Sequence, residues 1–74
     1  MDRKIHDIAY FLSFCIENYK NVKGIDGKEA MQIFLKYNVL EYLNDHFEVL
    51  HTQSKQWILE DIDEFIELRK DREV

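Results

Sequence analysis

The sequence predicts an all-α domain, a compact bundle of about four helices that begins with one long helix. Three observations support this. Proline is absent and the two glycines, Gly24 and Gly27, lie close together, so strong helix breakers interrupt the chain in one place. Apolar residues recur every three or four positions, which is the period of a helix rather than a strand. With 74 residues there is room for one domain, so residues 1–74 are expected to fold as a single unit.

The first predicted helix spans residues 3–21 and carries the clearest apolar stripe in the chain. One face collects residues at helical spacing: Ile5, Ile8, Ala9, Leu12, Cys15, Ile16 and Tyr19. Three aromatic residues lie off this stripe: Tyr10, Phe11 and Phe14. Apolar side chains therefore cover more than half of the helix circumference, which exceeds what packing on one side requires. We expect this helix to be either central to the domain or shared with a partner.

Three later helices are predicted from the same apolar period, over residues 27–37, 39–50 and 60–71. At each start an Asp or Asn stands three residues before a Glu. This spacing resembles a capping box, in which side chains satisfy the free amides of a helix start. The three pairs are Asp26 with Glu29, Asn38 with Glu41, and Asp61 with Glu64.

The chain changes character between the third and fourth predicted helices. Residues 51–56 are polar, whereas Trp57, Ile58 and Leu59 are apolar. The apolar stretch fits either an extended segment that packs on the core or an early turn of the last helix. We expect the extended segment.

The charge balance argues against nucleic acid as a partner, and the short apolar runs argue against a membrane. The chain has 10 basic and 15 acidic residues, giving a net charge of −5. Nucleic acids are bound through clustered Lys and Arg, whereas several basic residues here stand at helix ends, where they complement the helix dipole. The longest apolar run, residues 8–16, is far shorter than the ~20 residues of a membrane-spanning helix, and no export signal is visible.

A single cysteine predicts a reducing cytoplasm.

The sequence predicts no catalytic residues, no metal site and no cofactor. Cys15 lies within the apolar stripe, so we expect a buried, inert thiol rather than a nucleophile. His46 and His51 are five residues apart and diverge around a helix, which argues against shared metal ligation. The two glycines lack the other residues of a phosphate-binding loop. We therefore expect that the protein is not an enzyme.

Three polar residues fall near the predicted core on different helices: Glu17, His51 and Arg69. A structural ion pair or a rim position explains Glu17 and Arg69, and contacts with carbonyls at a helix end explain His51. The alternative is a pocket in which the three side chains converge to bind a small molecule or to support a minor enzyme activity. A structure distinguishes the two interpretations.

Three short motifs stand in order along the chain: Cys-Ile-Glu at residues 15–17, Leu-His-Thr at residues 50–52 and Asp-Ile at residues 61–62. Together they resemble a family of small bacterial proteins known only as a domain of unknown function, and the likeness spans nearly the whole chain. The resemblance implies a bacterial, cytoplasmic protein and supplies no catalytic residue. Genes of that family often neighbour a gene for a domain similar to ADP-ribosyltransferases, which implies a two-gene module of toxin and antitoxin or of effector and immunity protein.

The sequence thus favours a non-enzymatic protein–protein interaction module that binds a protein partner or forms a homodimer. Aromatic residues are enriched at interfaces, and a domain of this size gains stability from association. The candidate partner-binding residues are Tyr10, Phe11, Phe14, Tyr42 and Trp57. Within the implied two-gene module, this chain would be the antitoxin or immunity member.

Overall fold

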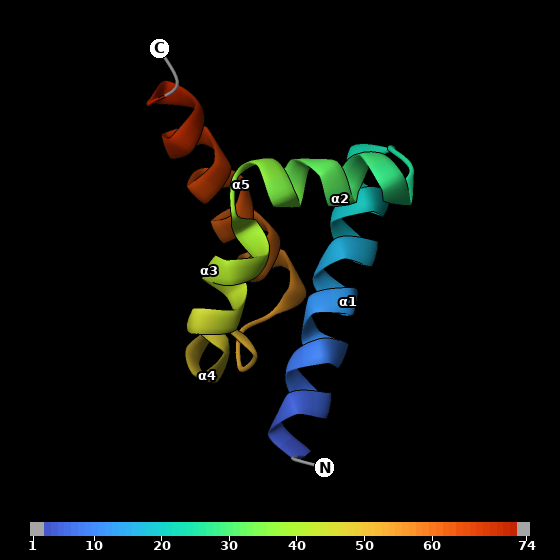
Figure 1. Ribbon diagram of the computed structural model, residues 1–74, viewed down its shortest axis with the longest axis vertical. Helices are drawn as coiled ribbons and strands as arrows, with labels where there is room; N and C mark the ends of the chain where they lie inside the picture. The colour runs from blue at the N-terminus through green and yellow to red at the C-terminus, as the bar shows by residue number, and fades with distance from the viewer. Residues whose placement is uncertain (1–2, 73–74) are drawn as a thin grey trace.

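The computed structural model describes residues 3–72, and all the regular structure in that range is helical. The helices are α1 (Arg3–Lys23), α2 (Gly27–Lys36), α3 (Val39–Asp45), α4 (Phe47–Leu50) and α5 (Lys55–Asp71) (Figure 1). The predicted all-α class and the long first helix are confirmed. The bundle has one more short helix than the sequence predicts.

Helix α1 is central to the arrangement because it contacts α2, α3 and α5. Helix α2 crosses the C-terminal end of α1, and α3 and α4 then run back toward the level of its N-terminal half (Figure 1). The N-terminal end of α1 and the C-terminal end of α5 lie at opposite ends of the molecule, which measures 41 × 24 × 22 Å.

The turn between α1 and α2 forms as predicted. Gly24 has a φ of 66°, in the left-handed region that glycine adopts at little cost, and α1 ends beside it. The Ile25 amide donates back to the Lys20 carbonyl at 3.1 Å, closing the end of the helix. An Asp26 carboxylate oxygen accepts from the Glu29 amide at 2.8 Å, so Asp26 caps α2.

The third predicted helix, over residues 39–50, is divided at His46 into α3 and α4, where the backbone leaves helical geometry. The prediction that Asn38 caps this helix is also wrong. Asn38 has a φ of 58°, and its side chain makes no capping bond. Asn tolerates this left-handed conformation, and here it reverses the chain between α2 and α3. The apolar period continues through residues 39–50, so the periodicity alone carries no sign of the break.

Helix α5 begins at Lys55, five residues earlier than predicted. The Ser54 hydroxyl accepts from the Trp57 amide at 3.1 Å and caps the helix. Residues 57–59 therefore form an early part of α5, and the predictions of an extended segment and of an Asp61 cap are wrong. The buried residues Ile58, Ile62 and Ile66 follow at i, i+4 and i+8, so the earlier start adds one more residue to the inward stripe.

The core is built from one inward stripe of each helix. The buried residues are Phe11, Cys15, Tyr19, Ala30, Phe34, Tyr37, Val39, Leu43, Phe47, Leu50, Ile58, Ile62 and Ile66. On α1 this stripe is turned relative to the predicted one, because Phe11 is only 6% exposed whereas Ile5 is 59% exposed. The Phe11 ring meets the Phe47 ring edge-on at 5.5 Å between centroids. Phe11 is therefore a core residue.

Candidate functional site

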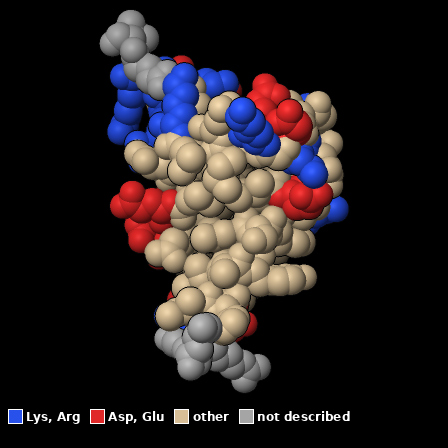
Figure 2. All heavy atoms as spheres, turned by 45° about the vertical axis from the view of Figure 1, so that its right-hand side comes forward, with Lys and Arg blue, Asp and Glu red and all other residues tan. Residues whose placement is uncertain are grey.

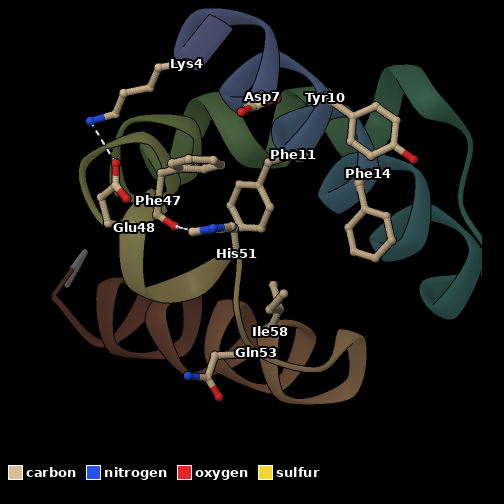
Figure 3. Close-up of a pocket in the computed structure, with 10 residues that line it drawn as sticks. All are labelled: Lys4, Asp7, Tyr10, Phe11, Phe14, Phe47, Glu48, His51, Gln53 and Ile58. Carbon is tan, nitrogen blue, oxygen red and sulfur yellow. Dashed lines mark hydrogen bonds and ion pairs between the residues drawn. The ribbon is translucent and has the colours of Figure 1, made fainter.

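An open groove of about 500 Å³ lies between the N-terminal half of α1 and the segment that runs from α4 to the start of α5 (Figure 3). Its size falls within the range of roughly 300–1,000 Å³ typical of ligand-binding clefts. The α1 wall consists of Lys4, Asp7, Tyr10, Phe11 and Phe14. The opposite wall consists of Phe47, Glu48, His51, Gln53 and Ile58. We call this feature the α1–α4 groove.

The α1 wall follows from helical spacing. Asp7, Tyr10, Phe11 and Phe14 are separated by steps of three, one and three residues, so they share one face of the helix. Phe11 is buried and Phe14 is half-buried, while Tyr10 is 75% exposed. The sequence contains no Asp, Glu, Lys or Arg from residue 8 to residue 16. The N-terminal half of α1 accordingly presents a face on which charged side chains are sparse (Figure 2).

The opposite wall is fixed by two side chains at the end of α4. The His51 Nδ1 atom lies 2.7 Å from the Phe47 carbonyl oxygen, which can only accept, so Nδ1 donates the proton. The His51 ring also stacks on the Phe47 ring at 4.4 Å with an interplanar angle of 12°. The Thr52 hydroxyl donates to the Val49 carbonyl at 2.8 Å. Both residues satisfy carbonyls near the end of α4, as the sequence predicts for His51.

One ion pair links the two walls at the rim of the groove. The Lys4 Nζ atom lies 2.8 Å from a carboxylate oxygen of Glu48, with both side chains largely exposed (Figure 3). This contact with Lys4 lowers the pKa of the Glu48 carboxyl from its usual range. Asp7, on the same rim, forms no ion pair with any side chain that the structure describes. Asp7 is therefore the acidic group of the groove whose charge has no such partner.

The structure does not gather Glu17, His51 and Arg69 into one cavity. Glu17 is exposed on α1 and pairs with Lys20 at 2.9 Å. His51 lines the α1–α4 groove, whereas Arg69 lines a separate cavity and lies over the Phe65 ring at 4.5 Å. The pocket that the alternative interpretation required from these three residues is not formed.

Two of the predicted partner-binding aromatics lie away from the groove. Tyr42 lines a cavity of about 260 Å³ with Arg69, and its ring stacks on Phe65 at 4.2 Å. Trp57 borders a smaller hollow of about 120 Å³ together with Glu60, Asp61 and Glu64. Only Tyr10, Phe11 and Phe14 of the predicted set belong to the groove.

Of the other groove residues, sequence reasoning named only His51 and missed the rest. Asp7 stands in the same helical register as the α1 aromatics, so its place on that wall could have been read from the spacing. Phe47 and Ile58 gave no such signal, because they reach the groove only through tertiary packing against α1. The wall opposite α1 comes from residues far from α1 in the sequence, so only the fold shows which residues form it.

The single thiol behaves as predicted. Cys15 is 1% exposed, and burial raises its pKa to about 12, so it is protonated at neutral pH. Within residues 3–72, no group of three His, Cys, Asp or Glu side chains is placed to hold a metal ion. None of the helices described combines the length and the apolar character needed to cross a bilayer.

Fold and groove together define a small all-helical domain with an open groove that is lined by both apolar and polar side chains. The chain belongs to the family described as Protein of unknown function (DUF3791), whose sequence pattern matches residues 10–69. This confirms the resemblance expected from the sequence motifs. The matched range includes most of the groove, while Lys4 and Asp7 precede it. Comparison with curated proteins and with solved structures found no match.

Proposed function

We propose that this protein is a non-enzymatic interaction module that binds a protein partner through the α1–α4 groove. The observation that carries the proposal is the exposed ring of Tyr10 beside the half-buried Phe14, on a stretch of α1 without charged residues. Aromatic side chains bury large apolar areas in complexes, at roughly 25 cal/mol for each Å² removed from water. Such residues at the centre of a contact usually supply most of the binding energy.

The polar groups of the groove favour a protein over a small molecule as the occupant. Small-molecule sites present a few convergent polar groups that fix the orientation of the ligand. Here the His51 Nδ1 proton already bonds to a carbonyl, and Glu48 is already paired with Lys4. The rest of the lining combines apolar side chains with Asp7 and Gln53 in an open groove, and this suits the side chains of another polypeptide.

The family resemblance supplies a candidate partner. We place the chain in the bacterial cytoplasm as the antitoxin or immunity member of a two-gene module, with the neighbouring ADP-ribosyltransferase-like protein as the one it neutralises. A neutralising protein acts by covering a surface of its target, so the α1–α4 groove would suffice without catalytic groups.

The proposal is tested by co-expressing the chain with the product of the gene next to its own. Size-exclusion chromatography with light scattering should show a complex, and titration calorimetry should give its dissociation constant. Tyr10→Ala should weaken the complex by about tenfold or more, as truncation of an interface anchor does. Leu35→Ala is the matched control, because Leu35 is 60% exposed on α2 and lies outside the groove. The control should leave the dissociation constant within about twofold.

Two results would contradict the proposal. The first is the absence of any complex with the neighbouring gene product, combined with a chain that is monomeric by itself at micromolar concentration. The second is an equal loss of binding in Tyr10→Ala and Leu35→Ala. A homodimer that Tyr10→Ala dissociates would instead mean that a second copy occupies the groove.

A further inference from the structure

We infer that the segment bound in the α1–α4 groove is an amphipathic helix of about three turns, with a Lys or Arg placed to meet Asp7. This inference rests on the proposed interaction function and adds the chemistry of the occupant. It follows from the shape of the groove walls and from the distribution of charge along the rim.

The walls suit a helix. Asp7, Tyr10 and Phe14 stand at i, i+3 and i+7 on α1, so their side chains form a ridge along the groove. Ridges of this kind pack against the side-chain rows of a neighbouring helix. The α1 wall runs from Lys4 to Phe14, which at 1.5 Å per residue is about 15 Å, or roughly three helical turns. A partner strand would need a sheet edge to extend, and residues 3–72 contain no strand.

The lining of the groove indicates which side chains the bound helix turns toward it. The half-buried Phe14 and the exposed Tyr10 leave apolar surface facing the groove, whereas Ile58 and Phe47 line it as core side chains that are almost fully covered (Figure 3). Large apolar side chains at i, i+3 or i+4, and i+7 of a helix would cover this surface, as in other complexes in which a helix lies in a groove.

The charges on the rim indicate the sign of the charge that the occupant carries. The Glu48 carboxylate is compensated by Lys4 at 2.8 Å, whereas Asp7 forms no ion pair with any described side chain. The chain as a whole carries a net charge of −5. A basic residue on the occupant would form a charge-assisted hydrogen bond with Asp7, while an acidic one would be repelled. A second copy of this chain would bring the same negative charge and another Asp7, so a different, basic segment is the better occupant.

The experiment uses two synthetic peptides of about 14 residues, long enough for the groove wall. Both are acetylated and amidated and carry the same leucine stripe, with lysines flanking the stripe in one and glutamates in the other. Each is titrated into the full ¹⁵N-labelled chain and followed by amide chemical shifts and fluorescence anisotropy. We expect the lysine peptide to shift amides in residues 4–14 and 47–58, and to bind about tenfold more tightly than the glutamate peptide.

Charge reversal separates the groove from general attraction to an acidic protein. Asp7→Lys should weaken binding of the lysine peptide by about tenfold and strengthen that of the glutamate peptide. Glu17→Lys makes the same change of net charge on the same helix, outside the groove, and should change affinity by about twofold or less. Asp7→Asn provides a milder second variant, and circular dichroism verifies that every variant folds.

The outcomes distinguish this inference from the function on which it rests. Equal binding of the two peptides, equal effects of Asp7→Lys and Glu17→Lys, or shifts centred away from the groove would each overturn the basic-helix inference. If neither peptide binds while the neighbouring gene product forms a complex sensitive to Tyr10→Ala, the proposed function stands and the inference fails. If that complex is also absent and the chain is monomeric, both fail.

Discussion

The Tyr42 hydroxyl donates a hydrogen bond of 2.7 Å to a carboxylate oxygen of Asp61 and so joins α3 to α5. The Tyr42 ring stacks on Phe65 at 4.2 Å, one turn further along α5. The pair is partly buried and joins two helices that are separated along the chain by α4. It is therefore one of the polar contacts that set how α5 packs on α3.

Tyr42→Phe removes this hydrogen bond and keeps the ring stack. We expect the free energy of unfolding to fall by about 1 kcal/mol, the usual net contribution of one such bond. Urea denaturation followed by circular dichroism measures the change. Tyr10→Phe is the matched control, because the Tyr10 side chain is exposed, and it should alter stability by less than about 0.5 kcal/mol. Equal effects of the two substitutions would mean that the Asp61 contact adds nothing.

The same hydrogen bond predicts a dependence of stability on alkaline pH. Burial, followed by the bond to Asp61, raises the pKa of Tyr42 to about 12, above its ordinary value of about 10. The folded protein thus holds this proton more tightly than the unfolded chain does. Its contribution is complete below pH about 10 and is lost as the pH rises toward about 12. The stability difference between wild type and Tyr42→Phe should shrink across that interval, and a constant difference would contradict the assignment.

Ser54→Ala tests where α5 begins. Loss of the cap on the Trp57 amide should cost about 1 kcal/mol and speed hydrogen exchange in the first turn of α5. Urea denaturation and exchange measured by NMR give the two quantities. Ser13→Ala, at an exposed position inside α1, should leave stability unchanged or slightly raised. A silent Ser54→Ala would instead favour a helix that begins nearer residue 60.

The Lys4–Glu48 pair predicts that stability depends on pH in the acidic range. Because Lys4 lowers the pKa of Glu48 in the folded chain, the pair stabilises the folded state at pH values above the ordinary carboxyl range. This contribution is lost as the pH falls. Lys4→Met should raise the pKa of Glu48 toward its ordinary value in an NMR titration, and added salt should do so in part. Lys28→Met, an exposed lysine on α2, should leave the titration of Glu48 in place. Equal shifts in both variants would rule out the contact as the cause.

Cys15 reports the opening of the core. Since its thiol is buried and its pKa is raised to about 12, a thiol reagent such as iodoacetamide should label the folded protein slowly, even at mildly alkaline pH. Labelling should accelerate in urea in step with unfolding, which mass spectrometry can follow. Rapid labelling of the native protein would show that the core around α1 opens without global unfolding.

The family match and the helical fold were accessible from the sequence because both depend on local pattern. The turn at Gly24 and the Asp26 cap involve residues a few positions apart, so spacing was sufficient to predict them. Ser54 and Asp61 show the limit of this reasoning. Both residues can cap a helix. The choice between them depended on whether Ile58 is buried against other helices, and the spacing of residues along the chain does not give this information.

What the sequence determined by itself is the helical period, the helix ends at strong local signals, and an opening helix with apolar side chains around most of its circumference. Tertiary structure decided which part of that circumference is covered. It turned Phe11 into the core, left Tyr10 outside, and set Glu17, His51 and Arg69 at separate places. The physical reason is that periodicity fixes angles within one helix, whereas burial depends on contacts between segments far apart in the chain.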